Sequence, residues 1–69
     1  MVEVITVEPI AQGWAVRHHA VENPQVFSSG AKAEAAARSL GSRLSQAGSP
    51  AEIRVILRDG SVGGRFACT

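Results

Sequence analysis

The chain has little of what small proteins use as covalent or metal-based support. Cys68 is its only cysteine, so one chain can form neither an internal disulfide nor a cysteine-based zinc site. A domain of about 60 residues buries only about 60% of its unfolded surface and is marginally stable alone. For a single domain over residues 1–69, oligomerisation is the remaining means of stabilisation.

The sequence also lacks an excess of either charge, with a formal net charge of +1. No global field therefore attracts nucleic acid or anionic lipid. The first residues hold an early Glu3, no basic cluster and a break at Glu8–Pro9, which predicts neither a signal peptide nor a membrane span. The lone thiol fits a reducing compartment. We expect a cytoplasmic protein without a membrane partner.

The chain is rich in apolar segments with the pattern of β-strands. Residues 2–8 and 53–58 are typical of strands that are apolar on both faces, and Trp14 to about Val21 alternates as a further strand. Pro9 is expected to end the first strand, because it cannot donate a ladder hydrogen bond. Gly13 can supply a positive φ in the turn that follows.

A single helix is predicted from about Ser29 to Ala47, with Ser29 as its N-cap and Gly48 just after its end. Residues 25–27 before it are typical of a short edge strand. Asp59–Gly60 indicates a type I′ hairpin turn, and Gly63–Gly64 indicates a bulge in the last strand. The fold class is α+β, with a mainly antiparallel sheet of four to five strands packed on one helix in the order ββ(β)αββ.

One helix covers one face of such a sheet, so the other face should seek a partner. Burying the indole of Trp14 is favourable, which assigns Trp14 and Val16 to the helix side. The opposite face is then expected to mix aliphatic and basic side chains, as protein interfaces do. The candidate interface residues are Ile5, Val7, Arg17, His19, Arg54, Ile56, Arg58 and Arg65.

Several short segments share their order and spacing with a known pattern. They are Gly13-Trp14-Ala15-Val16-Arg17, Phe27 with Ser29, the helix with Ala36-Ala37-Arg38-Ser39-Leu40, and Arg58-Asp59-Gly60-Ser61-Val62. Together they resemble a family of short bacterial proteins of unknown function with the pattern GWAV[RK]…F-x-T-x-A-E-A…A-R-x-L…RDGRI. The resemblance implies a fold and brings no catalytic residue. The order of elements also resembles, at the level of the fold, the arm-binding domains of phage-type integrases, which bind DNA.

No constellation of residues specifies a chemistry. Neighbours on a strand point to opposite faces, so His18 and His19 are not expected to chelate one metal. The serines lie at caps and turns, and the carboxylates are scattered. We therefore predict a protein that is not an enzyme, with no catalytic residue, metal or cofactor.

Self-association, most simply as a homodimer, is the predicted first property, through the uncovered sheet face or a strand edge. The alternative is a nucleic-acid-binding module that uses Arg17, Arg54, Arg58 and Arg65. The lack of tyrosine weighs against it, since few stacking platforms are present. A third hypothesis is a small enzyme or ligand carrier with a pocket between subunits.

Overall fold

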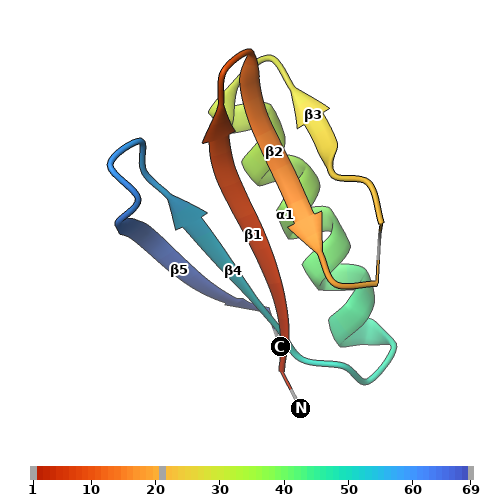
Figure 1. The fold of residues 1–69 in the computed structure, drawn as a ribbon. Helices are drawn as coiled ribbons and strands as arrows, with labels where there is room; N and C mark the ends of the chain where they lie inside the picture. Colours follow the sequence, from red (N-terminus) through yellow and green to blue (C-terminus); the bar gives the residue numbers. More distant parts are fainter. Residues whose placement is uncertain (1, 21, 69) are drawn as a thin grey trace.

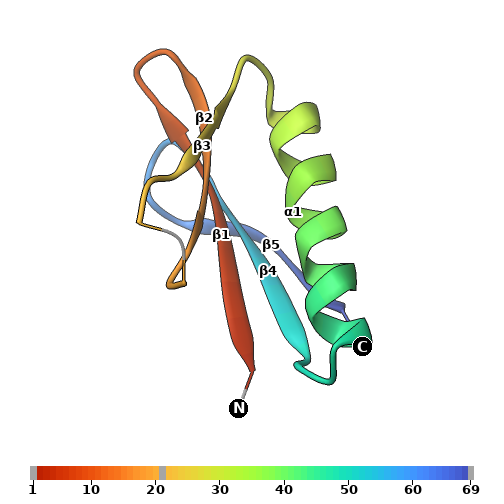
Figure 2. The same cartoon turned by 90° about the vertical axis from the view of Figure 1, so that its right-hand side faces the viewer.

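A computed structural model describes residues 2–20 and 22–68, and this part of the chain forms a five-stranded sheet covered on one side by one helix. Figures 1 and 2 show the two layers, with the helix along one side of the sheet and the other side uncovered. The α+β fold expected from the sequence is thus confirmed. The elements are β1 (Glu3–Ile10), β2 (Gly13–His18), β3 (Gln25–Phe27), α1 (Gly30–Gln46), β4 (Ala51–Ile56) and β5 (Val62–Cys68).

The strands lie in the order β3-β2-β1-β4-β5. β1 runs antiparallel to β2 and parallel to β4, and the remaining two pairs are antiparallel. The parallel pair is explained by the connection between β1 and β4, which includes α1 and crosses over one face of the sheet. Both edges are therefore strands from hairpins, the short β3 and the longer β5 (Figure 1).

The helix begins and ends as its sequence predicts. Ser29 has an extended backbone, and its hydroxyl accepts a hydrogen bond of 3.2 Å from the amide of Lys32. At the other end Gly48 has a φ of 91°, and the Ser49 amide donates to the Leu44 carbonyl at 2.8 Å. Ala33, Ala37 and Gly41 form the buried stripe. Small side chains along this stripe let the helix lie close to the sheet.

The core lies between the helix and one face of the three central strands. Strand pairing places Ile5 opposite His18 and next to Ile53, and Val7 opposite Val16. The prediction that Ile5 and Val7 belong to the uncovered face is wrong, since they are 0% and 1% exposed under the helix. Residues directly opposite each other in an antiparallel pair share a face, so assigning Val16 to the core also assigns Val7 to it.

Three strand boundaries differ from expectation. β1 continues through Pro9 to Ile10, because β4 pairs only with Glu3–Val7 and no ladder on that side needs a donor at Pro9. β2 ends at His18 rather than near Val21, which lies outside the described residues. β4 covers 51–56 instead of 53–58, so Arg58 lies in the following turn.

Two turns depend on glycine. Gly13 has a φ of 146° after the turn at Ala11–Gln12, as expected for a glycine at this place. The predicted type I′ turn at Asp59–Gly60 is wrong, because no described non-glycine residue has a positive φ. Instead the Gly60 amide donates to the Leu57 carbonyl, the Leu57 amide donates to the Ser61 carbonyl, and within this turn it is Gly60 that has a left-handed φ, of 89°. This is the pattern of a three-residue hairpin loop.

The last strand carries the expected irregularity. The β4–β5 register shifts between Val55 and Ile56, so Ile56 pairs with Val62 and Val55 with Gly64. Gly63 is the extra residue, which confirms the predicted bulge.

Candidate functional site

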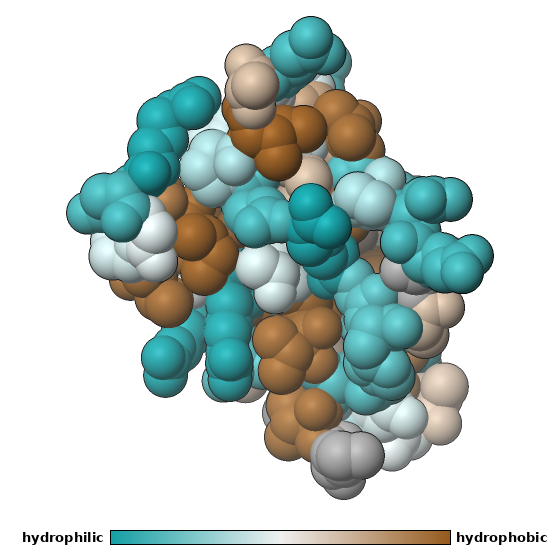
Figure 3. Space-filling view, viewed as in Figure 1, coloured by the Kyte–Doolittle hydropathy of each residue, from teal (hydrophilic) through white to brown (hydrophobic). Residues whose placement is uncertain are grey.

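The face of the sheet away from α1 mixes short aliphatic side chains with charged ones. Figure 3 shows brown apolar areas there that are separated by teal polar groups. Arg17 makes an ion pair with Glu8 across β1 and β2, and Arg54 makes one with Glu52 along β4. Two of the four arginines predicted for this face are therefore already bonded to carboxylates.

The remaining candidates of the predicted interface lie apart from one another. Ile56 is half-buried on the outer face, paired with Val62. Arg65 lies opposite Arg54 on the same face and, among the described residues, has no carboxylate within ion-pair distance. Arg58 is in the turn after β4, with its guanidinium carbon 6.0 Å from the centre of the Trp14 ring. Because Trp14 faces the helix, Arg58 is not placed among the outer-face arginines.

The two sheet edges differ in how well they are protected. β3 has three residues and follows directly after Pro24, and short or proline-flanked edges pair poorly with other chains. β5 has seven residues, contains no proline and carries a single charged side chain, Arg65. No described element lies beside its outer edge in Figure 1. β5 is therefore the edge with free backbone donors and acceptors over a useful length.

Three chemically active side chains meet at the end of β2. The Nε2 atom of His19 lies 2.8 Å from Glu3 Oε2, and the Nε2 atom of His18 lies 3.5 Å from Glu3 Oε1. The two imidazole centroids are 4.4 Å apart. The expectation that the two rings point to opposite faces is wrong, because β2 ends at His18 and strand alternation does not extend to His19. Sequence reasoning also missed Glu3, whose place beside the histidines follows from the β1–β2 register.

His18 is the unusual member of this Glu3–His18–His19 cluster. Its side chain is 4% exposed, and its Nδ1 atom accepts a hydrogen bond of 3.4 Å from the Ala20 amide. Its Nε2 atom is buried and has no hydrogen-bond partner among the described residues, although Glu3 lies within ion-pair distance. A buried polar atom without a partner costs free energy, so this one calls for an explanation.

Glu3 is held in its ionised form. The hydrogen bond from His19 is the main cause that keeps the pKa of Glu3 below its ordinary value, and it outweighs the opposing effect of desolvation. The carboxylate therefore offers oxygen atoms to both imidazoles at neutral pH.

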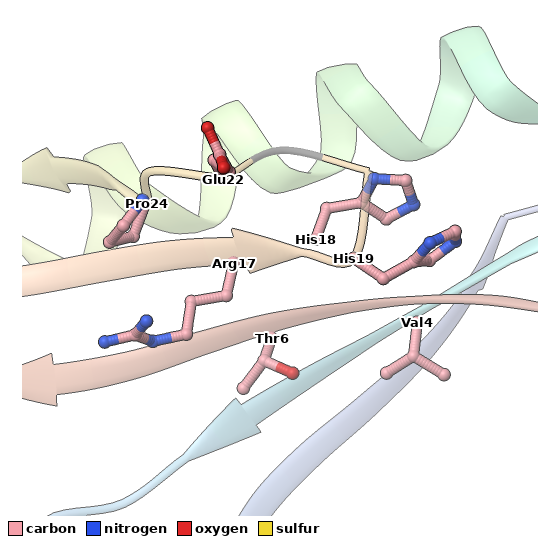
Figure 4. Close-up of a pocket in the computed structure, with 7 residues that line it drawn as sticks. All are labelled: Val4, Thr6, Arg17, His18, His19, Glu22 and Pro24. Carbon is pink, nitrogen blue, oxygen red and sulfur yellow. The ribbon is translucent and has the colours of Figure 1, made fainter.

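An open hollow adjoins the cluster on the outer face (Figure 4). Strand residues form its floor and the loop before β3 forms one wall. The lining residues are Val4, Thr6, Arg17, His18, His19, Glu22 and Pro24. Both imidazoles are drawn at one end of this hollow, beside the loop, and Arg17 lies at the other end.

Comparison with known proteins gave no match to any family model, curated protein or solved structure. The resemblance to the short bacterial family thus stays a prediction. No described helix is both long and apolar enough to cross a membrane.

Proposed function

We propose that this protein is a self-associating module that forms a homodimer by pairing β5 with β5 of a second copy. The observation that carries the proposal is the unprotected outer edge of this seven-residue strand. Pairing two such edges in antiparallel fashion joins two sheets into one and satisfies backbone groups that would otherwise bond only to water.

The composition of β5 supports pairing with an identical strand. Its one charge, Arg65, points to the outer face, and Phe66 points toward the helix side, where it packs against the core. The ring of Phe66 is only half-buried, and the guanidinium of Arg38 lies 4.3 Å from its centre. A second copy placed against this edge would complete the burial of the ring, which is favourable for an aromatic side chain.

A two-fold axis at Phe66 gives the pairing that avoids charge conflict. It places Phe66 against its symmetry mate and Arg65 opposite Ala67 of the partner subunit. An axis at Arg65 would instead set two arginines directly opposite each other, and like charges in that position are destabilising. We therefore centre the proposed interface on Phe66, with strand pairing over Gly64–Cys68.

Two other surfaces have less support. The outer face is crossed by the Arg17–Glu8 and Arg54–Glu52 pairs, which would have to be buried or broken in a face-to-face dimer. The same pairs leave few free guanidinium groups for phosphate, so a nucleic-acid interface is the weaker alternative. Oligonucleotide binding that falls steeply with salt would favour that alternative over the dimer.

Substitutions of opposite charge at Ala67 should change the Kd of the dimer in opposite directions. In the proposed pairing, residue 67 of each copy lies opposite Arg65 of the partner subunit, so each dimer contains two such contacts. Ala67→Lys makes both contacts repulsive, and Ala67→Glu makes both attractive. Each pair contributes about 0.2–1 kcal/mol, so the dimer Kd should rise roughly two- to thirtyfold with lysine and fall by a similar factor with glutamate. Sedimentation equilibrium over a concentration series measures both changes.

Glu52 provides an internal check, because it lies opposite Ala67 within one chain. The introduced lysine therefore stabilises the isolated chain while it weakens the dimer, and a loss of dimer cannot be attributed to unfolding. Ile56→Glu on the outer face serves as the matched control and should leave the dimer intact. Dissociation by Ile56→Glu, with no response to either change at Ala67, would refute the β5 edge and assign the interface to the outer face.

A further inference from the structure

We propose that Glu3, His18 and His19 together bind one first-row divalent transition metal ion, with Zn²⁺ as the ion to test. The inference is independent of the proposed dimer, since β1 and β4 separate the β2 end from the β5 edge. Two imidazole nitrogens and one carboxylate form a donor set that suits zinc and its neighbours.

The geometry needs only small movements to accommodate the ion. One ligand atom from each of the three residues lies within 4.8 Å of the others. Donors around a tetrahedral zinc with bonds of about 2.0–2.1 Å are about 3.3 Å apart. The Nε2 atom of His18 lies 3.5 Å from Glu3 Oε1 and that of His19 lies 2.8 Å from Glu3 Oε2, so each imidazole is near this spacing from one carboxylate oxygen. A carboxylate that binds through both oxygens, or a rotation of the Glu3 side chain, would bring the three residues onto one centre.

The Nε2 atom of His18 is the second and independent observation. It is buried, no residue in the described part of the chain forms a hydrogen bond with it, and it is directed toward the Glu3 carboxylate. A metal ion at this point would give the atom the partner that it lacks. Coordination through Nε2 moves the ring proton to Nδ1, so the long 3.4 Å hydrogen bond from the Ala20 amide is exchanged for a metal bond. The Ala20 N–H and the Nδ1–H would then face each other as two donors, so the turn that holds the exposed residue Ala20 has to shift when the ion binds.

The surroundings leave a coordination position open. Three protein ligands are typical of zinc sites that keep water or a small anion in the fourth position. Here the exposed His19 side opens onto the hollow of Figure 4, where Thr6, Arg17 and Glu22 lie within the lining. The site would thus bind the metal with a water molecule accessible from the hollow.

Calorimetric titration of the metal-free protein with ZnCl₂ tests the proposal, since His18 and His19 are the only histidines and background sites are few. We expect saturable binding of one ion per chain. His19→Ala should weaken it by about 100-fold or more, because changes even beyond the direct ligands cost 10–100-fold. His19 is 67% exposed, so the variant is expected to fold. Glu3→Gln should weaken binding in the same way.

Two control variants make the result specific. Glu22→Gln removes a carboxylate that lines the hollow but lies outside the cluster, and Cys68→Ser removes the only thiol. Both should bind Zn²⁺ as the unchanged protein does. No saturable binding to the unchanged protein, equal affinity in His19→Ala, or loss of binding in Cys68→Ser would each overturn the assignment. Binding of Co²⁺ followed by visible absorption adds a readout of the ligand geometry.

Discussion

Ile5→Ala should lower the free energy of unfolding by about 2–5 kcal/mol, the usual cost of truncating a large buried aliphatic residue. Ile5 is fully buried between His18 on β2 and Ile53 on β4. Its Cδ1 atom also reaches the helix, 3.6 Å from where a Cβ on Gly41 would stand. The whole domain is expected to have roughly 3–10 kcal/mol of stability at about 0.05–0.15 kcal/mol per residue. The change therefore removes a large part of it.

Val4→Ala is the matched control for Ile5, because it lies on the same strand but faces the uncovered side. Its side chain is only half-buried, so the loss should stay below about 1 kcal/mol. Urea unfolding followed by circular dichroism, at one fixed protein concentration, measures both variants. Similar losses for Ile5 and Val4 would mean that the two faces of β1 are assigned wrongly.

Gly13→Ala should destabilise the protein by more than about 3 kcal/mol, since it combines backbone strain with a backbone clash. The φ of 146° is a conformation that side chains rarely adopt. An added Cβ would also lie 2.2 Å from the carbonyl oxygen of Phe27, which no side-chain rotation can relieve. Either β3 would leave the sheet or the turn before β2 would open.

Gly60→Ala separates the two causes. Gly60 also has a positive φ, of 89°, but no atom of residues 2–20 or 22–68 outside the turn itself lies within 4 Å of the added Cβ. Only the conformational cost remains, about 1–2 kcal/mol. Thermal unfolding of both variants compares them directly. An equal Tm for Gly13→Ala and Gly60→Ala would contradict the close approach of β3 to Gly13.

Much of the fold can be predicted because local signals agree with it. Ser29 and Gly48 delimit the helix, residues 25–27 form an edge strand, and Gly63 marks the bulge. The face of β1 could not be predicted in the same way. Val4 and Ile5 are both apolar, so alternation within β1 does not distinguish the two faces. The pairing of Val7 with Val16 decides it, and that pairing depends on where the turn at Ala11–Gln12 begins.

The histidine cluster could not be predicted for a related reason. Neighbouring side chains point to opposite faces only inside a strand, and β2 ends between His18 and His19. Glu3 is distant in sequence from both histidines and joins them only through the β1–β2 register. A long-range pairing of this kind leaves no local pattern. In the β1–β2 register Ile5 lies opposite His18, and Glu3 is two residues away on the same face of β1. Glu3 could be placed beside the histidines only if this register were known.

Amide hydrogen exchange measured over a range of protein concentrations tests the proposed β5 pairing most directly. Where two copies pair, the amides of Gly64–Cys68 that point away from β4 become hydrogen-bonded and exchange slowly. We predict that their protection rises with concentration, while the amides of the short edge strand β3 do not change. Equal protection of β5 amides at every concentration, in a protein that light scattering finds monomeric throughout, would contradict the account.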